Sequence, residues 1–141
     1  MIYYLFITIF LGFELQKLFN FNFFFRIRMI SVDYSTKIMK KTKSIAYKEI
    51  TKIALIDIVY LILVLIGLFT INRYFFSAIL ILSVLNTIMF KIKNKTFKKI
   101  YYILDILISI ILLSLVIINF TYYQLDSVQF LKHIYSLWQF R

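Results

Sequence analysis

The chain has 141 residues, of which 62% are hydrophobic and 20% aromatic, and its formal net charge is +11. This composition is more apolar than a water-soluble domain of this length needs, so we expect an all-α integral membrane protein. The absence of Cys excludes disulfides, thiolate metal sites and thiol nucleophiles, and with no Pro and two Gly we expect continuous helices packed through bulky side chains.

The first expected element is a membrane span over residues 2–25, which begins with a long uncharged run. A cleaved signal peptide would carry positive charge before its apolar region, and a flat interfacial helix would carry a long charged face. Neither pattern fits, so a span is favoured. Glu14 and Lys17 lie three residues apart, with Asn20 three further along, and this spacing predicts a polar stripe that faces the other helices.

A basic segment over residues 26–52 follows, and we expect it to be cytoplasmic. It carries eight Lys or Arg residues. Asp33 or Ser35 can cap a helix that begins near Thr36, and the apolar spacing beyond it predicts a basic amphipathic helix on the lipid headgroups. The basic residues either recruit anionic lipid or serve only as a topology signal. The anionic-lipid contact candidates, with those of the next basic loop, are Arg26, Arg28, Lys37, Lys40, Lys41, Lys43, Lys91, Lys93, Lys95, Lys98 and Lys99.

An apolar hairpin over residues 53–90 supplies the second and third expected spans, at about 53–71 and 74–90. Asp57 and Arg73 are the only formal charges in it. Two runs of this length match the thickness of a bilayer core, so the hairpin indicates that the chain is a multi-pass membrane protein.

The fourth expected span covers about residues 100–122, behind a basic loop at 91–99. The loops 26–52 and 91–99 hold thirteen of the seventeen basic residues, so the positive-inside rule places both in the cytoplasm and both termini outside. The predicted fold is one membrane domain over residues 1–141, with four transmembrane helices in two hairpins. Its predicted location is the cell membrane.

An external amphipathic tail over residues 124–140 ends the chain. Asp126 can cap a helix there, with Gln129 three residues on as in a capping box. One apolar stripe follows, formed by Leu125, Val128, Leu131, Tyr135 and Trp138. This pattern predicts a C-terminal interfacial amphipathic helix on the outer leaflet. His133 is the single His, and since a metal ligand needs partners, we interpret it as a solvated side chain.

The two halves of the chain resemble each other weakly. The segments 25–28 and 90–93 both read Phe, basic, Ile, basic, and each is followed by a helix with an acid near its start, Asp57 or Asp105. The halves are either two copies of one helical hairpin or similar by chance, in a chain rich in Ile, Lys and Phe.

Few residues in the expected spans carry chemistry. The intramembrane polar candidates are Glu14, Lys17, Asp57, Asn86 and Asp105, with further amides at Asn72 and Asn119. Acids inside a membrane are costly and are functional hypotheses by default. Only Glu14 is expected to be deep. We expect the two Asp residues, about five residues into their helices, to lie near the headgroups, bridged by Lys52, Lys91 or Lys99.

No motif fixes a reaction. The sequence has no HExxH, GxSxG or Gly-rich phosphate loop, so we expect no enzyme, catalytic residue, metal or cofactor. No soluble domain offers a nucleic-acid groove, so the expected partners are the lipid bilayer with its anionic headgroups and another membrane protein or a second copy.

The first functional hypothesis is an interaction, accessory or structural role in a membrane assembly. The alternatives are a proton-linked small transporter or pore protomer and a holin-like permeabiliser. The preference for Ile, Phe, Asn and Lys suits AT-rich codons and points to a low-GC bacterium or one of its phages.

Overall fold

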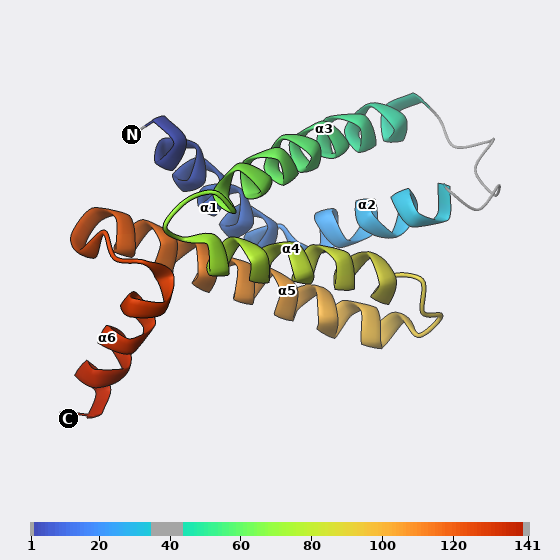
Figure 1. Cartoon of the computed structure of the whole chain (residues 1–141). Helices are drawn as coiled ribbons and strands as arrows, with labels where there is room; N and C mark the ends of the chain where they lie inside the picture. Colours follow the sequence, from blue (N-terminus) through green and yellow to red (C-terminus); the bar gives the residue numbers. More distant parts are fainter. Residues whose placement is uncertain (1, 35–43, 140–141) are drawn as a thin grey trace.

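In a computed structural model of the chain, which describes residues 2–34 and 44–139, every regular element of the described part is a helix (Figure 1). The all-helical fold class is therefore confirmed. The elements are α1 (Ile2–Phe19), α2 (Phe21–Tyr34), α3 (Ser44–Gly67), α4 (Arg73–Met89), α5 (Lys95–Ile118), a π-helical turn η1 (Asn119–Tyr123) and α6 (Ser127–Gln139).

Three helical segments are long and apolar enough to cross a membrane, namely Ile2–Phe19, Ile50–Gly67 and Lys95–Tyr123. The apolar helix α4 is shorter, with 17 residues. Large apolar side chains such as Leu55 and Ile111 are exposed on the outside of the bundle. Lipid accommodates such a surface without loss, whereas water does not. These features suggest a location in a membrane.

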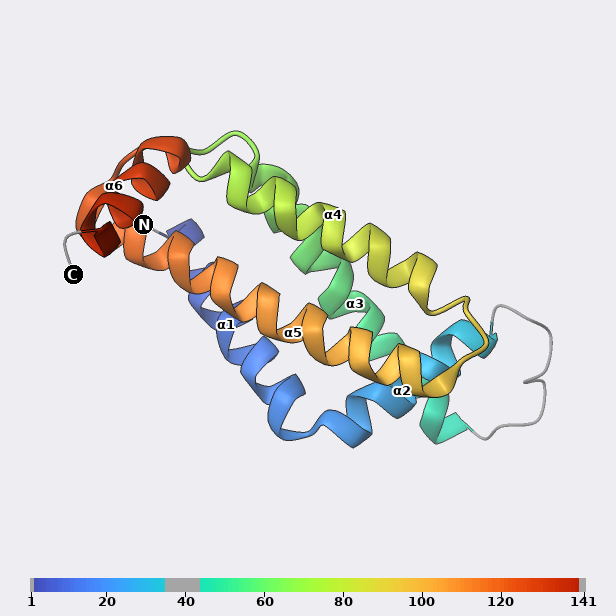
Figure 2. The same ribbon diagram turned by 90° about the horizontal axis from the view of Figure 1, so that it is seen from below.

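The helices α1, α3, α4 and α5 form a bundle in which α5 packs against both α1 and α4. The end of α2, the start of α3 and the α4–α5 turn lie together, and we call this the basic end (Figures 1 and 2). The N-terminus, the α3–α4 turn and α6 lie at the opposite end, the terminal end. Parts of both basic segments therefore adjoin the same end of the bundle.

The helix expected over residues 2–25 is divided at Asn20, where the chain changes direction (Figure 2). The N–H of Phe24 donates to the Asn20 carbonyl oxygen at 3.2 Å and helps to start α2. Asn is a weak helix former. Phe24 and Phe25 are buried against Tyr102, so packing of these rings accounts for the new direction.

The basic segment 26–52 is largely helical where it is described, because α2 and α3 both extend into it. Asp33 therefore lies in the last turn of α2, and its expected role as a cap stays a prediction. Ser35 and the helix start near Thr36 lie outside the described residues. The same holds for the lipid-contact candidates Lys37, Lys40, Lys41 and Lys43.

Two apolar clusters hold the bundle together. The cluster at the terminal end consists of Ile7, Val64, Phe75, Phe76, Ile79, Leu113, Val116 and Phe130. The cluster at the basic end consists of Phe24, Phe25, Phe90, Tyr102 and Ile106.

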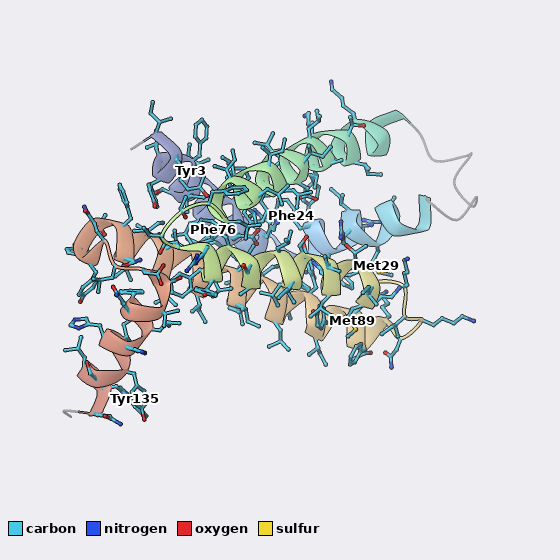
Figure 3. The ribbon with its side chains drawn as sticks, viewed as in Figure 1. Tyr3, Phe24, Met29, Phe76, Met89 and Tyr135 are labelled. Atoms are coloured by element: carbon cyan, nitrogen blue, oxygen red, sulfur yellow. The ribbon has the colours of Figure 1, made fainter. Side chains whose placement is uncertain are left out.

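Tyr3 and Phe76 mark the place where α1, α3 and α4 meet (Figure 3). The Tyr3 hydroxyl donates to the Leu63 carbonyl oxygen at 2.9 Å, which ties α1 to α3. Gly67 permits this close approach, because a Cβ atom there would collide with the Phe76 ring and the Tyr3 hydroxyl.

The two similar segments of the sequence differ in structure. Residues 25–28 lie within α2, whereas residues 90–93 form the turn between α4 and α5. The rings of Phe25 and Phe90 nevertheless contact each other, with centroids 6.0 Å apart. The resemblance therefore does not extend to the local backbone, because one copy continues as helix and the other reverses the chain.

The tail forms α6, as predicted. Gln124 adopts a left-handed conformation with φ 50°, and the Val128 N–H donates to Asp126 Oδ2 at 3.3 Å, which confirms Asp126 as the cap. Phe130 is buried against the bundle, and α6 then leaves it, with Tyr135 far from the other helices (Figure 3). The side chains of the predicted stripe from α6 itself are all exposed, namely Val128, Leu131, Tyr135 and Trp138.

Candidate solute-binding cavity

A cavity of about 370 Å³ lies between the two apolar clusters. Val64 from the cluster at the terminal end and Phe24 from the cluster at the basic end both line it. All five helices from α1 to α5 contribute to its wall. Its volume falls in the range of small-molecule sites, which is roughly 300–1,000 Å³.

Five charged side chains from four helices line this cavity, which we call the charged cavity: Glu14, Lys17, Arg28, Asp57 and Asp105. Asn86 lines it as well. All five intramembrane polar candidates named from the sequence therefore meet in one place. The uncharged polar side chains of the wall are Tyr60, Ser83, Asn86, Thr87, Tyr102 and Ser109.

Asp57 and Asp105 lie further along their helices than we expected. They come thirteen and ten residues after the first residues of α3 and α5, because these helices begin at Ser44 and Lys95. At 1.5 Å per residue, these positions are roughly 20 Å and 15 Å from the helix starts. The expectation that both carboxylates lie one and a half turns into their helices is therefore wrong.

Glu14 and Lys17 form an ion pair, as the i, i+3 spacing allows. Lys17 Nζ donates to Glu14 Oε1 at 2.8 Å, and both side chains are largely buried. The ammonium group also lies 4.8 Å from the centre of the Phe13 ring. The positive charge of Lys17 therefore compensates the negative charge of Glu14 within the cavity wall.

Asp105 is joined to α4 by an amide. Asn86 Nδ2 donates to Asp105 Oδ2 at 2.6 Å. Glu14, Lys17 and Arg28 line the same cavity as Asp105. We had expected a lysine in place of the amide.

The expected lysine bridges have no direct support. The Lys99 ammonium lies 5.7 Å from the centre of the Phe21 ring. A bridge from Lys52 or Lys91 to either Asp residue stays a prediction.

Three buried polar atoms of the cavity residues have no hydrogen-bond partner in the described part of the chain. They are Arg28 Nε, the Tyr60 hydroxyl oxygen and Asn86 Oδ1. The Asn86 side chain is deeply placed, since its residue is only 8% exposed. Buried polar groups are satisfied in most proteins, so these three atoms leave hydrogen-bonding capacity unused at the cavity wall.

Arg28 and Lys98, two of the anionic-lipid contact candidates, are not on the exposed surface where we expect such contacts. Arg28 lines the cavity, and its guanidinium lies 5.6 Å from the centre of the Phe90 ring. Lys98 is buried. The remaining described candidates are exposed and stay predictions, namely Arg26, Lys91, Lys93, Lys95 and Lys99.

Sequence reasoning missed the cavity residues Tyr60, Tyr102 and Ser109. Tyr60 follows Asp57 by three residues, Tyr102 precedes Asp105 by three, and Ser109 follows it by four. Residues three or four apart share one face of a helix. Polar residues at this spacing in each apolar helix were the signal that could have found them.

The other buried amides are engaged at the terminal end. Asn119 Nδ2 donates to Asn72 Oδ1 at 2.6 Å and to the Leu125 carbonyl oxygen at 2.8 Å, and the Leu125 N–H donates to Asn119 Oδ1. Asn72 Nδ2 donates to the Tyr4 hydroxyl oxygen at 3.5 Å. We call Asn72, Asn119 and Tyr4 the amide cluster, and it fastens the start of the tail to the bundle.

No group of three His, Cys, Asp or Glu side chains within residues 2–34 and 44–139 is placed to hold a metal ion. The ring of His133 lies against Tyr123, with centroids 5.1 Å apart. The sequence matches no protein-family model, no curated protein and no solved structure. The geometry of the charged cavity therefore carries the functional argument.

Proposed function

We propose that the protein is a small helical membrane transporter in which a polar solute and protons bind in the charged cavity. One observation carries this proposal: charged side chains from four helices meet around a cavity of ligand size. Ionisable groups inside membranes are expensive and occur mainly where charge is bound or moved. This is the second of the functions that the sequence allowed.

In this mechanism, the carboxylates of the charged cavity bind and release the proton. Glu14, Asp57 and Asp105 come from three helices and line one cavity, and a carboxylate is a group that can bind and release a proton. A solute that brings charge into the cavity changes the protonation of these groups. Entry of the solute and movement of a proton are then coupled.

We also propose four spans in two hairpins, with α4 as the span beyond the three long helices. Its 17 residues correspond to about 26 Å of helix, close to a hydrocarbon core of about 30 Å. The basic end then faces the cytoplasm, both termini are external, and the protein lies in the cell membrane. The exposed stripe of α6 lies on the outer leaflet, and the exposed basic residues meet anionic headgroups.

Single-cysteine labelling tests this topology on a chain that has no native Cys. An impermeant thiol reagent applied to intact cells should label the Ser136→Cys variant and leave the Ser44→Cys and Asn94→Cys variants unlabelled. Labelling of Ser44→Cys and Asn94→Cys without labelling of Ser136→Cys would show that the protein has the opposite orientation in the membrane.

Proteoliposomes test the transport proposal without choosing a solute. Vesicles that contain the protein are loaded with the small-molecule fraction of a cell extract, and a dye reports the external pH. We expect the outward solute gradient to drive a pH change that empty vesicles lack. Glu14→Gln and Asp105→Asn should abolish this change, whereas Asp126→Asn, a carboxylate of the tail, should preserve it.

A pH trace identical to that of empty vesicles would contradict the transporter. In that case the interaction, accessory or structural role is the next hypothesis, and purification in mild detergent with identification of co-purifying chains addresses it. Release of a large dye from the vesicles would instead favour the holin-like hypothesis.

A further inference from the structure

The charged cavity carries unsatisfied hydrogen-bonding groups of both kinds. Arg28 Nε and the Tyr60 hydroxyl can donate, and Asn86 Oδ1 can accept, and in the described chain none of the three has a partner. All three residues line the cavity. A ligand that fits this wall must therefore supply both an acceptor and a donor.

The charges of the cavity have both signs as well. The Glu14 carboxylate is compensated by Lys17, and Asp105 accepts from Asn86. Arg28, on α2, and Asp57, on α3, line the same cavity outside these two pairings.

Simpler ligands match only half of this arrangement. A simple cation would pair with Asp57 but leave the donors of Arg28 and Tyr60 unused, and an anion would leave Asp57 and Asn86 Oδ1 unused. A bound metal ion is not favoured, because the described residues include no group of three suitable side chains. The apolar part of the wall, which includes Ile53 and Leu80, accommodates a hydrocarbon body.

We propose that the charged cavity binds a zwitterion that carries a primary ammonium group and an anionic group on a small apolar body. The ammonium group lies toward Asp57 and Asn86 Oδ1, and the anionic group lies toward Arg28 Nε and the Tyr60 hydroxyl. A free amino acid with an apolar side chain and the phosphoethanolamine headgroup of a lipid share this chemistry. The inference rests on the proposed function and names its solute.

A series of ligands with the same hydrocarbon body tests the charge requirement. Calorimetric titration of the full chain in detergent compares leucine with isopentylamine, which has only the ammonium group, and 4-methylpentanoate, which has only the carboxylate. We expect leucine to bind at least about tenfold more tightly than either, because each loses one charge-assisted pairing. Equal binding of the amine and leucine would overturn the proposal, and so would the absence of binding by every zwitterion.

Glycerophosphoethanolamine distinguishes the two sources. Binding of leucine alone identifies a free amino acid, and binding of glycerophosphoethanolamine alone identifies a lipid headgroup. Either result supports the zwitterion.

Two conservative variants assign the two halves of the site. Asp57→Asn should weaken the binding of leucine and isopentylamine about tenfold or more and leave the binding of 4-methylpentanoate unchanged. Arg28→Gln should weaken the binding of 4-methylpentanoate and leave the binding of isopentylamine unchanged. Arg26→Gln, an exposed position on the same helix as Arg28, and Asp126→Asn on the tail are the matched controls. Equal weakening by the controls would contradict the assignment.

The outcome is separable from that of the transport assay. Leucine binding without solute-driven proton movement would refute the transporter and leave the zwitterion site intact. Proton movement driven by the extract, with no zwitterion bound, would overturn this inference and leave the transporter intact.

Discussion

At the terminal end, Asn72 and Asn119 bond to each other, to the backbone and to Tyr4, whereas in the charged cavity Asn86 bonds through Nδ2 and leaves Oδ1 unpartnered. The amide cluster uses neutral side chains, of which Asn72 and Asn119 are fully buried and Tyr4 is partly buried. The charged cavity uses ionisable side chains around open space.

The contrast reflects the free energy of burying each kind of group. A neutral amide loses little when all of its hydrogen bonds are made inside the protein, while a charge loses far more solvation. Hydrogen bonds between Asn side chains can therefore hold helices together at little cost in solvation free energy. The five charged side chains of the charged cavity need compensation from partners, solvent or a bound ligand.

The largest expected effect comes from breaking the amide cluster. Asn119→Leu leaves the Asn72 amide and both backbone groups of Leu125 without their partner. Because unsatisfied buried polar groups are costly, we expect the free energy of unfolding in detergent to fall by about 3 kcal/mol. Denaturant titration measures this loss.

Asn22→Leu is the matched control, since Asn22 is exposed on α2, and it should change stability little. If both variants unfold at the same denaturant concentration, the amide cluster does not hold the terminal end.

A smaller effect is expected from crowding the same end. Gly67→Ala places a Cβ atom against the Phe76 ring and the Tyr3 hydroxyl, so it should disturb the Tyr3 bond to Leu63 and lower stability by about 2 kcal/mol. Gly12→Ala meets nothing within 4 Å and should be neutral or slightly stabilising in the same thermal melts. A neutral Gly67→Ala would show that α1, α3 and α4 are not closely packed.

The smallest stability effect is expected in the charged cavity. Glu14→Gln keeps an acceptor for the Lys17 ammonium and removes only the charge, so we expect a loss of about 1 kcal/mol in the same titration. Adding Lys17→Met should restore part of it, because no unpaired charge remains. Proton-coupled activity should nevertheless disappear in both variants. A fully active Glu14→Gln protein would remove Glu14 from the mechanism.

Much of the helical framework could be predicted from local sequence. The apolar runs in α3 and α5, the cap at Asp126 and the stripe of α6 all depend on neighbours in the chain. The break at Asn20 depends on distant residues, because it is the packing of Phe24 and Phe25 against Tyr102 that redirects α2.

The cavity was only partly predictable for the same reason. Its five polar residues stood out as costly groups in apolar segments, but their meeting depends on which helices are neighbours. Arg28 was named only as a lipid contact, and not as a cavity residue, because the sequence indicated a loop where α2 continues. Without a structure, no local pattern tells a headgroup contact from a cavity wall.

Two buried serines test most directly whether one polar region is open and the other closed. Ser109 is buried on the cavity wall, and Ser127 is buried beside the amide cluster. In the Cys-free chain, a small hydrophilic methanethiosulfonate should react quickly with Ser109→Cys in the folded protein, and react with Ser127→Cys only after unfolding. Failure of both folded variants to react, or equal reaction of both, would contradict a cavity that is open to polar solutes.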